Sequence, residues 1–535
     1  MNKALVFLLL ALLPLSIIAQ NTLSIIPQPQ KLKKSKGTFR LNLQTHYHVD
    51  TTLAKNAISY LQAHLKYNAG YVLSKTTHKQ SNSIHFQYKN IQHAEGYKLT
   101  VTTKDITIQA KDTAGFFYAV VSLLQTMHPK IWETTNSPKV KKYYKKSWII
   151  PALTIEDYPH YVWRGLMLDS SRNFFSVAYI KKFIDRMAQY KLNRFHWHLS
   201  DDEGWRMESK HYPLLTQVGA RRGTGTHLPF STYPTMRGKN NKVQSGYYSQ
   251  KEMKEIVAYA KARSVEILPE IDMPAHAKAA LVAYPTLLND PKDKSLYRSV
   301  QKVQNNTMNP ALESSYIFID NIISELTEIF PFDYIHIGGD EIPKGAWKRS
   351  PAVKSLMKKY KLKNVREVQN YFFKRVDTIL LKHHRKMIAW QEVLKGRTNV
   401  RHNAIFMAWK SVKATKSIIK QKRNVIMSPV QYLYFDQQYH RKKGEPGRTW
   451  STPVSTKKVY SLPQVHSSYV QGVHACLWSE IVMNESIADY LTWPRALALA
   501  EVAWTKPKLR VWKEFKYRLK HAGIARLKAQ SIHYY

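Results

Sequence analysis

The chain has 535 residues, 44% hydrophobic and 12% aromatic, which excludes a disordered protein, and its single cysteine, Cys476, excludes a disulfide framework. Its 82 Lys and Arg residues against 37 Asp and Glu give a formal net charge of +45 at pH 7. Such an excess attracts polyanions, including anionic glycans, although a solvated basic surface is the simpler explanation. The chain contains no zinc-finger, helix-turn-helix or RNA-binding signature, so nucleic acid is not an expected partner.

Residues 1–19 predict a secretory signal peptide. Lys3 precedes an apolar block over Ala4–Leu13, which is followed by Pro14 and by the small residue Ala19, after which we expect cleavage. The block is too short to span a bilayer and no later run is long enough, so we expect no integral membrane segment. These features predict a secreted or periplasmic protein, with a non-cleaved anchor as the alternative.

Residues 20–150 predict a small α+β domain. Strand-like runs cover Tyr97–Thr102 and Asp105–Ala110, and helical periodicity covers Leu53–Leu65 and Thr113–Met127. The segment offers no acid pair and no cluster of metal ligands, so we expect it to support the rest of the chain rather than to catalyse.

Over residues 151–505, short apolar strands alternate with amphipathic helices. The predicted strands are Gly165–Asp169, Arg194–Ser200, Val265–Glu270, Tyr334–Gly338, Met387–Trp390, Ala404–Trp409, Val425–Ser428 and Gly472–Trp478. The predicted helices are Val177–Tyr190, Lys251–Ala262, Glu313–Ile329, Val365–His383, Val412–Lys420 and Ile487–Val502. Eight strands with helices between them, over roughly 350 residues, predict a (β/α)8 barrel of the TIM type. Residues 506–535 predict a basic tail that packs on this barrel.

The stretch from Tyr334 to Glu341 predicts the centre of the active site, because chemistry in this fold lies at the C-terminal ends of the strands. An apolar run ends at Gly338 and Gly339, and two acids, Asp340 and Glu341, follow. Neighbouring side chains on an extended backbone point in opposite directions, so both acids enter one site only if the glycines bend the chain. Two carboxyls held close together do not ionise equally, which favours one general acid and one charged partner. A solvated acid pair at the start of a loop is the alternative.

Seven segments have the order and spacing typical of glycoside hydrolase family 20. They are LDSSRNFF (168–175), NRFHWHLSDDEGWR (193–206), EILPEIDMPAH (266–276), HIGGDE (336–341), AWQEV (389–393), YFD (434–436) and LWSE (477–480). Over residues 150–505 the chain resembles the β-N-acetylhexosaminidases of this family, and the preceding α+β domain resembles their non-catalytic domain. The resemblance implies an exo-acting enzyme that removes terminal β-linked GlcNAc or GalNAc from glycans with retention, without metal or cofactor.

The resemblance also implies a role for each site residue. In this family the nucleophile is the acetamido oxygen of the substrate, which forms an oxazolinium intermediate, so the two-carboxylate scheme does not apply. Glu341 would act as general acid and then as base, and Asp340 would orient the acetamido N–H. Tyr434 would support the acetamido carbonyl. The remaining expected residues are the pocket walls Trp390, Trp409 and Trp478, the hydroxyl ligands Arg172, Asp436 and Glu480, and Asp201 with His276, which would tune Glu341.

Several alternatives stay open at this stage. His196 and His198 alternate on one strand as metal ligands of barrel hydrolases do, although we expect them to pack inside the barrel. His276 has the alternative of an ordinary buried histidine. A polar loop over residues 220–248 carries Arg221, Arg222, Arg237, Lys239 and Lys242 and suggests a specialised enzyme for sulfated or sialylated glycans. A glycan-binding protein with weak catalysis is the third function considered, and the oligomeric state is left open.

Overall fold

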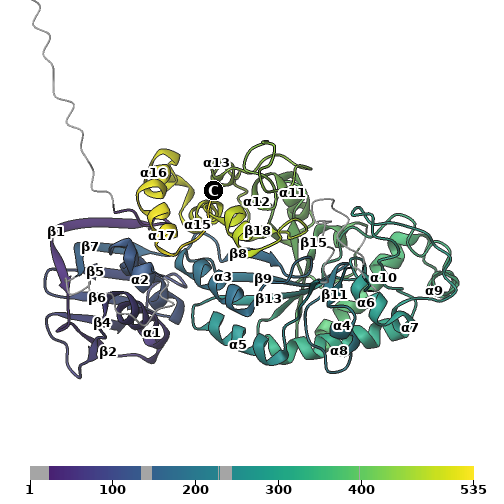
Figure 1. Cartoon of the computed structure of the whole chain (residues 1–535), viewed down its shortest axis with the longest axis horizontal. Coiled ribbons are helices and arrows are strands. Elements are labelled where there is room, and N and C mark those ends of the chain that lie inside the picture. The colour runs from purple at the N-terminus through teal and green to yellow at the C-terminus, as the bar shows by residue number, and fades with distance from the viewer. Residues whose placement is uncertain (1–22, 134–147, 224, 227, 229–243, 397) are drawn as a thin grey trace, which may run out of the picture.

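The computed structural model describes residues 23–133, 148–223, 225–226, 228, 244–396 and 398–535. The predicted signal peptide and the lysine cluster at 139–146 lie outside these residues. Figure 1 shows an N-terminal sheet domain beside a larger barrel, with the C-terminal helices lying along the top of both. Among the described helices, none has the length and apolar character needed to cross a bilayer.

The N-terminal part is a seven-stranded sheet in the order β1-β7-β5-β6-β4-β2-β3. Its strands are β1 (Lys31–Leu41), β2 (His46–Val49), β3 (Ser74–Lys75), β4 (Ser83–Tyr88), β5 (Tyr97–Val101), β6 (Ile106–Ala110) and β7 (Trp148–Asp157). Its helices are α1 (Lys55–His64) and α2 (Thr113–Gln125). Asp112 caps α2 by accepting a hydrogen bond from the Gly115 amide, and almost every residue of α2 is buried. The two predicted strands and the two predicted helices are all present.

The barrel consists of eight parallel strands, all at predicted positions. They are β8 (Trp163–Asp169), β9 (Arg194–Asp201), β13 (Glu266–Ile271), β14 (Tyr334–His336), β15 (Lys386–Trp390), β16 (Ile405–Ala408), β17 (Asn424–Met427) and β18 (Val470–Leu477). Each pairs with the next, and β18 pairs with β8, which also pairs with β9. The ring is therefore closed, which confirms the predicted (β/α)8 barrel preceded by an α+β domain.

Helices cover the outside of the barrel. The helices that follow its strands are α3 (Val177–Gln189), α5 (Gln250–Lys261), α8 (Glu313–Ile329), α10 (Val365–Lys382), α11 (Val412–Lys420), α14 (Glu485–Thr492) and α15 (Arg495–Trp504). Shorter helices lie in the loops: α4 (Leu214–Gln217), α6 (Lys278–Ala283), α7 (Pro285–Leu288), α9 (Pro351–Lys359), α12 (Val430–Leu433) and α13 (Thr456–Tyr460). Three short strands, β10 (Gly204–Trp205), β11 (Arg221–Arg222) and β12 (Gln244–Ser245), complete the rim.

The helix predicted over Ile487–Val502 is wrong as a single element. The structure divides it into α14 and α15 at Trp493 and Pro494. Proline has no N–H to donate to the preceding turn, so the helical hydrogen-bond ladder stops there. Apolar residues continue through the break because both helices pack against β18 of the barrel, and this continuity hides the break in the sequence.

A buried ion pair joins the two parts of the protein. Lys191 Nζ, at the end of α3, lies 2.8 Å from Asp157 Oδ2 at the end of β7, and both side chains are fully buried. The indole of Trp504 donates to the other oxygen of Asp157 at 2.9 Å. Two tail helices, α16 (Trp512–Arg518) and α17 (Ile524–Ala529), add contacts to both parts, since Arg526 donates to the carbonyl of Gln125 at 2.8 Å.

Candidate active site

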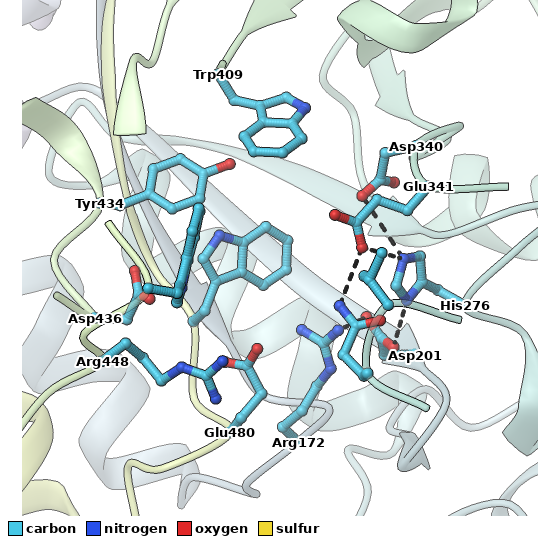
Figure 2. A pocket seen from close by; sticks show the side chains of 14 residues that line it. Arg172, Asp201, His276, Asp340, Glu341, Trp409, Tyr434, Asp436, Arg448 and Glu480 are labelled. Atoms are coloured by element: carbon cyan, nitrogen blue, oxygen red, sulfur yellow. Dashed lines mark hydrogen bonds and ion pairs between the residues drawn. The ribbon is translucent and has the colours of Figure 1, made fainter. Parts of the chain in front are cut away.

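The backbone bends sharply at the end of β14, where the acid pair begins. Gly338 has φ +65° and Gly339 has φ +90°, both in the left-handed region that favours glycine. A Cβ atom on Gly338 would lie 1.7 Å from Asp272 Oδ1, so no other residue fits. Glu341 itself has φ +43°. The predicted bend is confirmed, and it turns Asp340 and Glu341 into the same pocket (Figure 2).

This pocket has a volume of 270 Å³ and lies at the C-terminal ends of the barrel strands. Its lining residues are Arg172, Asp201, His276, Val300, Gln301, Asp340, Glu341, Trp409, Tyr434, Asp436, Arg448, Trp450, Trp478 and Glu480. Every predicted site residue except Trp390 is among them. Side chains from strands that are far apart in the sequence therefore converge on one cavity, as the barrel geometry requires.

Three carboxylates hold the guanidinium of Arg172 in place. Its Nη2 atom lies 2.6 Å from Asp201 Oδ2 and its Nη1 atom lies 3.1 Å from Asp169 Oδ2. Its Nε atom donates to Glu203 at 3.1 Å. Arg172 is 3% exposed, and its Cζ atom lies 5.1 Å from the centre of the Trp478 ring. A guanidinium fixed on three sides presents its remaining N–H groups to the pocket in one orientation.

His276 connects Asp201 to the acid pair (Figure 2). Its Nδ1 atom lies 3.1 Å from Asp201 Oδ1, while Nε2 lies 3.6 Å from Glu341 Oε2 and 3.8 Å from Asp340 Oδ2. Burial opposes ionisation of the imidazole, but Asp201 and Asp340 raise the pKa of His276 well above its usual value. The alternative of an ordinary core histidine therefore does not describe its position.

The two acids titrate in opposite directions. Burial raises the pKa of Asp340 to about 7, and the charge of Glu341 adds to this effect. Burial also acts to raise the pKa of Glu341, but hydrogen bonds from His276 and Gln301 lower it below its usual value. The pair is unequal, as its closeness predicts. These opposite pKa shifts favour the proton on Asp340 over Glu341, the expected acid.

The aromatic residues form one side of the pocket. The ring centres of Trp409 and Tyr434 are 6.0 Å apart and the rings lie nearly parallel, and Trp450 meets Tyr434 edge-on at 6.3 Å. Asp436 and Glu480 also line the pocket, and each has a buried carboxylate oxygen that accepts no hydrogen bond from the described residues. Apolar rings together with unsatisfied acceptors suit a sugar, which has C–H faces and hydroxyl edges.

Trp390 does not line the pocket, which corrects its predicted place in the pocket wall. It is 1% exposed, and its indole donates to Glu270 Oε1 at 3.0 Å in the centre of the barrel. The same carboxylate is contacted by His196 Nε2 at 2.9 Å and by His336 Nδ1 at 2.7 Å, and it is also bonded to His198. Glu270 lies on β13, two strands away from β15, and its carboxylate draws the indole into the barrel and away from the pocket.

The histidines of the HWH motif lie in this buried layer, as expected. His196, Glu270 and His336 bring three donor atoms within 4.8 Å of one another, a spacing that would suit a metal ion. Glu270 already accepts hydrogen bonds from Trp390 and His198, and His196 and His336 lie within ion-pair distance of it. His198 continues the chain of contacts upward, since its Nε2 lies 2.9 Å from Asp201 Oδ2. The layer thus supports Asp201 and, through it, His276.

Residues 161–507 match the profile described as glycosyl hydrolase family 20, catalytic domain, and residues 22–158 match the profile of domain 2 of the same family. The chain belongs to glycosyl hydrolase family 20. It is accordingly a glycoside hydrolase of the β-hexosaminidase family.

Relatives of known activity and structure cover most of this family 20 chain. A β-hexosaminidase of Vibrio furnissii is 32% identical over 488 residues, which are 90% of this chain and 76% of the relative. One from Porphyromonas gingivalis is 33% identical over 527 residues, 96% of this chain and 64% of the relative. The crystal structure of a family 20 exo-β-N-acetylglucosaminidase from Vibrio harveyi, in complex with N-acetylglucosamine, superposes with a TM-score of 0.88 at 33% identity. That alignment covers 96% of this chain and 78% of the other.

Four lining residues of this family 20 enzyme were not predicted. Val300 and Gln301 belong to the second long loop, residues 283–310, and Gln301 donates to Glu341 Oε2 at 3.1 Å. Arg448 and Trp450 lie in the loop before α13. These loops have no periodicity, so the sequence does not indicate which of their side chains point into the pocket.

The loop over residues 220–248 does not present its arginines as expected. Arg222 is 1% exposed and donates to Gln244 Oε1 at 2.6 Å, so its charge is used inside the protein. Arg221 is exposed but lines a different cavity, next to α3. Arg237, Lys239 and Lys242 lie outside the described residues. The preference for anionic glycans suggested by this loop therefore stays a prediction for these three residues, and Arg221 and Arg222 do not support it.

Proposed function

We propose that this enzyme is an exo-acting, retaining β-N-acetylhexosaminidase that removes terminal β-linked GlcNAc or GalNAc by substrate-assisted catalysis. The observation that carries the proposal is the convergence of Asp340 and Glu341 in a small pocket bordered by Trp409, Tyr434 and Trp478. The N-acetylglucosamine complex of the similar Vibrio harveyi enzyme supports the choice of sugar.

The size and lining of the pocket favour a single terminal sugar. Its 270 Å³ lies at the small end of ligand pockets, which typically span about 300–1,000 Å³. Asp436 and Glu480 would accept hydrogen bonds from sugar hydroxyls through their unsatisfied oxygens, and Arg172 would donate to a third hydroxyl. Charged partners strengthen such hydrogen bonds and penalise a sugar that lacks the matching hydroxyl.

Glu341 and Asp340 would act at two ends of the same sugar. Glu341 protonates the glycosidic oxygen while the acetamido oxygen attacks the anomeric carbon, so the glycosidic bond breaks as the oxazolinium ring closes. Asp340 accepts the acetamido N–H and balances the positive charge that develops on this ring. Glu341, now ionised, then removes a proton from the water that opens the ring, and the product keeps its β configuration.

Substrate binding would move the proton within the acid pair. In the free protein Asp340 is the protonated acid up to about pH 7. An acetamido N–H that donates to Asp340 favours the carboxylate, and the displaced proton then belongs on Glu341, where it is needed. His276, whose Nε2 lies 3.6 Å from Glu341 and 3.8 Å from Asp340, is placed to pass it between them. Glu341 is thus protonated, as a general acid must be, when the correct sugar is bound.

We also propose that the enzyme is exported to the periplasm or the cell exterior, because residues 1–19 have the features of a signal peptide. Its substrates would then be glycans outside the cytoplasm. A test is to compare the N-terminus of the protein recovered from the periplasm or medium with that of the translated chain. Cleavage after Ala19 supports export, and a full-length chain in the cytoplasmic fraction contradicts it.

Nitrophenyl β-glycosides of GlcNAc and GalNAc provide the direct test of the activity. Wild-type protein should release nitrophenol from them, and EDTA should leave the rate unchanged because none of these roles needs a metal. Glu341→Gln should lose about 10²–10⁴ in kcat/KM on the nitrophenyl substrate. It should lose far less on a dinitrophenyl glycoside, whose leaving group needs little protonation. A folded wild type that turns over neither sugar would favour a glycan-binding protein instead.

A further inference from the structure

A second cavity, of 390 Å³, adjoins the sugar pocket at Glu341. The two cavities share Val300, Glu341 and Trp409. An acid that protonates the glycosidic oxygen must lie between the sugar that is cleaved and the group that leaves. If Glu341 has the role proposed above, on which this inference rests, the second cavity receives the leaving part of the substrate.

Positive charge dominates the lining of this cavity. Four cationic side chains reach it, Arg298, Lys344, Lys395 and Lys410, and the lining carboxyl groups are those of Glu341 and Glu392. These cations come from three separate loops of the barrel rim, after β13, β14 and β15, and from the residue after Trp409. Lysines on a solvated helix face are spread over the surface, whereas these four cations line one cavity.

One of the four cations is neutralised within the protein. Lys410 Nζ lies 2.6 Å from Glu392 Oε1, and the other oxygen of Glu392 accepts the indole N–H of Trp409 at 3.0 Å. Lys410 therefore helps to hold Trp409 in position. Within the described part of the chain, no salt bridge engages Arg298, Lys344 or Lys395, and all three are exposed. Their charges remain available to a ligand.

Lys395 and Lys410 also repel each other. Burial lowers the pKa of Lys395, and the neighbouring charge of Lys410 lowers it further, although Glu392 acts in the opposite direction. Like charges held together cost free energy unless an anion lies between them. A carboxylate or sulfate bound in the cavity would relieve this repulsion and would accept charge-assisted hydrogen bonds from the guanidinium of Arg298.

We propose that this cavity is a subsite for an anionic sugar, so that the enzyme prefers substrates whose leaving sugar carries a carboxylate or a sulfate. The selected charge lies on the residue next to the cleaved GlcNAc or GalNAc and not on the cleaved sugar. The pocket for the cleaved sugar has five lining carboxyl groups (Asp201, Asp340, Glu341, Asp436 and Glu480) against the two guanidinium groups of Arg172 and Arg448, so it is the less favourable place for an added anion. The net charge of +45 alone predicts attraction to any polyanion; the subsite predicts that the position of the anion decides the rate.

The test compares two substrates that differ in one carboxylate on the leaving group: 4-nitrophenyl and 3-carboxy-4-nitrophenyl β-N-acetylglucosaminide. We expect kcat/KM to be about tenfold higher for the carboxylated substrate at low ionic strength, and the ratio to fall towards one in concentrated salt, where exposed charges are screened. Turnover of the neutral substrate with a ratio near one at low salt would overturn the subsite and leave the proposed activity standing. Failure to turn over either substrate would instead count against the proposed activity.

Two triple variants separate the cavity from the general charge of the protein. Arg298→Gln with Lys344→Gln and Lys395→Gln should bring the ratio close to one. The control, Lys33→Gln with Lys34→Gln and Lys36→Gln, removes the same charge from exposed positions on β1 and should keep the wild-type ratio. If the control variant loses the preference equally, a general field explains the effect and the subsite is refuted.

Disaccharides then identify the anion. GlcNAc β-linked to glucuronate is compared with GlcNAc linked to glucose, and GlcNAc linked to 6-sulfated galactose is compared with GlcNAc linked to galactose. A preference in the first pair assigns uronates, one in the second pair assigns sulfated sugars, and one in both assigns either anion. No preference in either pair contradicts the proposal.

Discussion

The Nε2 atom of His276 lies 3.6 Å from the Oε2 atom of Glu341. The opposite ring nitrogen is held by Asp201 at 3.1 Å, so the imidazole has a fixed orientation. We predict that His276→Ala lowers kcat/KM on the nitrophenyl substrate by about 10²–10³, because the imidazole that contacts both acids and can carry a proton between them is removed. Removing the imidazolium also raises the pKa of Glu341, so the pH profile should move to higher pH. A loss of rate with an unmoved profile would indicate a purely structural role.

The pH dependence of the free enzyme should follow Asp340. Its pKa is raised to about 7 by burial and by Glu341, so the pair keeps its proton below this pH and loses it above. We expect kcat/KM to fall as the pH rises through about 7. In Asp340→Asn the group that titrates is absent, so the remaining activity should lack this fall. An alkaline limb near pH 7 that persists in Asp340→Asn would assign the titration to another group.

Trp390 and Trp409 should respond differently to mutation. Trp390 is buried and donates to Glu270, so Trp390→Phe removes one hydrogen bond to a buried carboxylate and should cost about 1–3 kcal/mol of stability with little change in KM. Trp409 lines the pocket, so Trp409→Ala should raise KM for the nitrophenyl substrate. Thermal unfolding and steady-state kinetics on both variants check this. A large KM increase in Trp390→Phe would indicate that Trp390 contacts the substrate and would contradict its place outside the pocket.

The ion pair between Lys191 and Asp157 should be important for stability. Lys191→Met leaves the Asp157 carboxylate buried without its cation, which typically costs about 3–5 kcal/mol. We expect a lower midpoint of thermal unfolding. Lys182→Met is the matched control, because Lys182 is an exposed lysine on α3, the helix that precedes Lys191. Equal midpoints for the two variants would show that the buried pair does not hold the two parts together.

The sequence predicts the barrel well because its strands are buried on both faces. Parallel strands covered by helices are continuous apolar runs, and the run at Val425–Ser428 falls within one residue of β17. Prediction from the sequence fails where the direction of a side chain depends on a partner residue far along the chain. Trp390 ends β15 as predicted, but Glu270 on β13 draws its indole below the pocket.

Loop residues of the site are the part that the sequence does not reveal. Gln301 and Arg448 enter the pocket from segments without periodicity, and their direction is set by the packing of those loops on the rim. The ionisation of the acid pair is equally hidden. Adjacent acids predict an unequal pair, but which acid keeps the proton depends on His276, which follows a different strand. Motifs locate this site, and tertiary contacts decide its electrostatics.

Attack by the acetamido oxygen of the substrate is the central claim, and a series of N-acyl substrates tests it most directly. The 4-nitrophenyl β-glycosides with acetyl, fluoroacetyl, difluoroacetyl and trifluoroacetyl groups differ little in shape, but each fluorine makes the carbonyl oxygen a weaker nucleophile. We predict that kcat/KM falls steadily along the series, by about a hundredfold or more from first to last. A rate that does not depend on fluorination would contradict this mechanism and indicate an enzyme nucleophile instead.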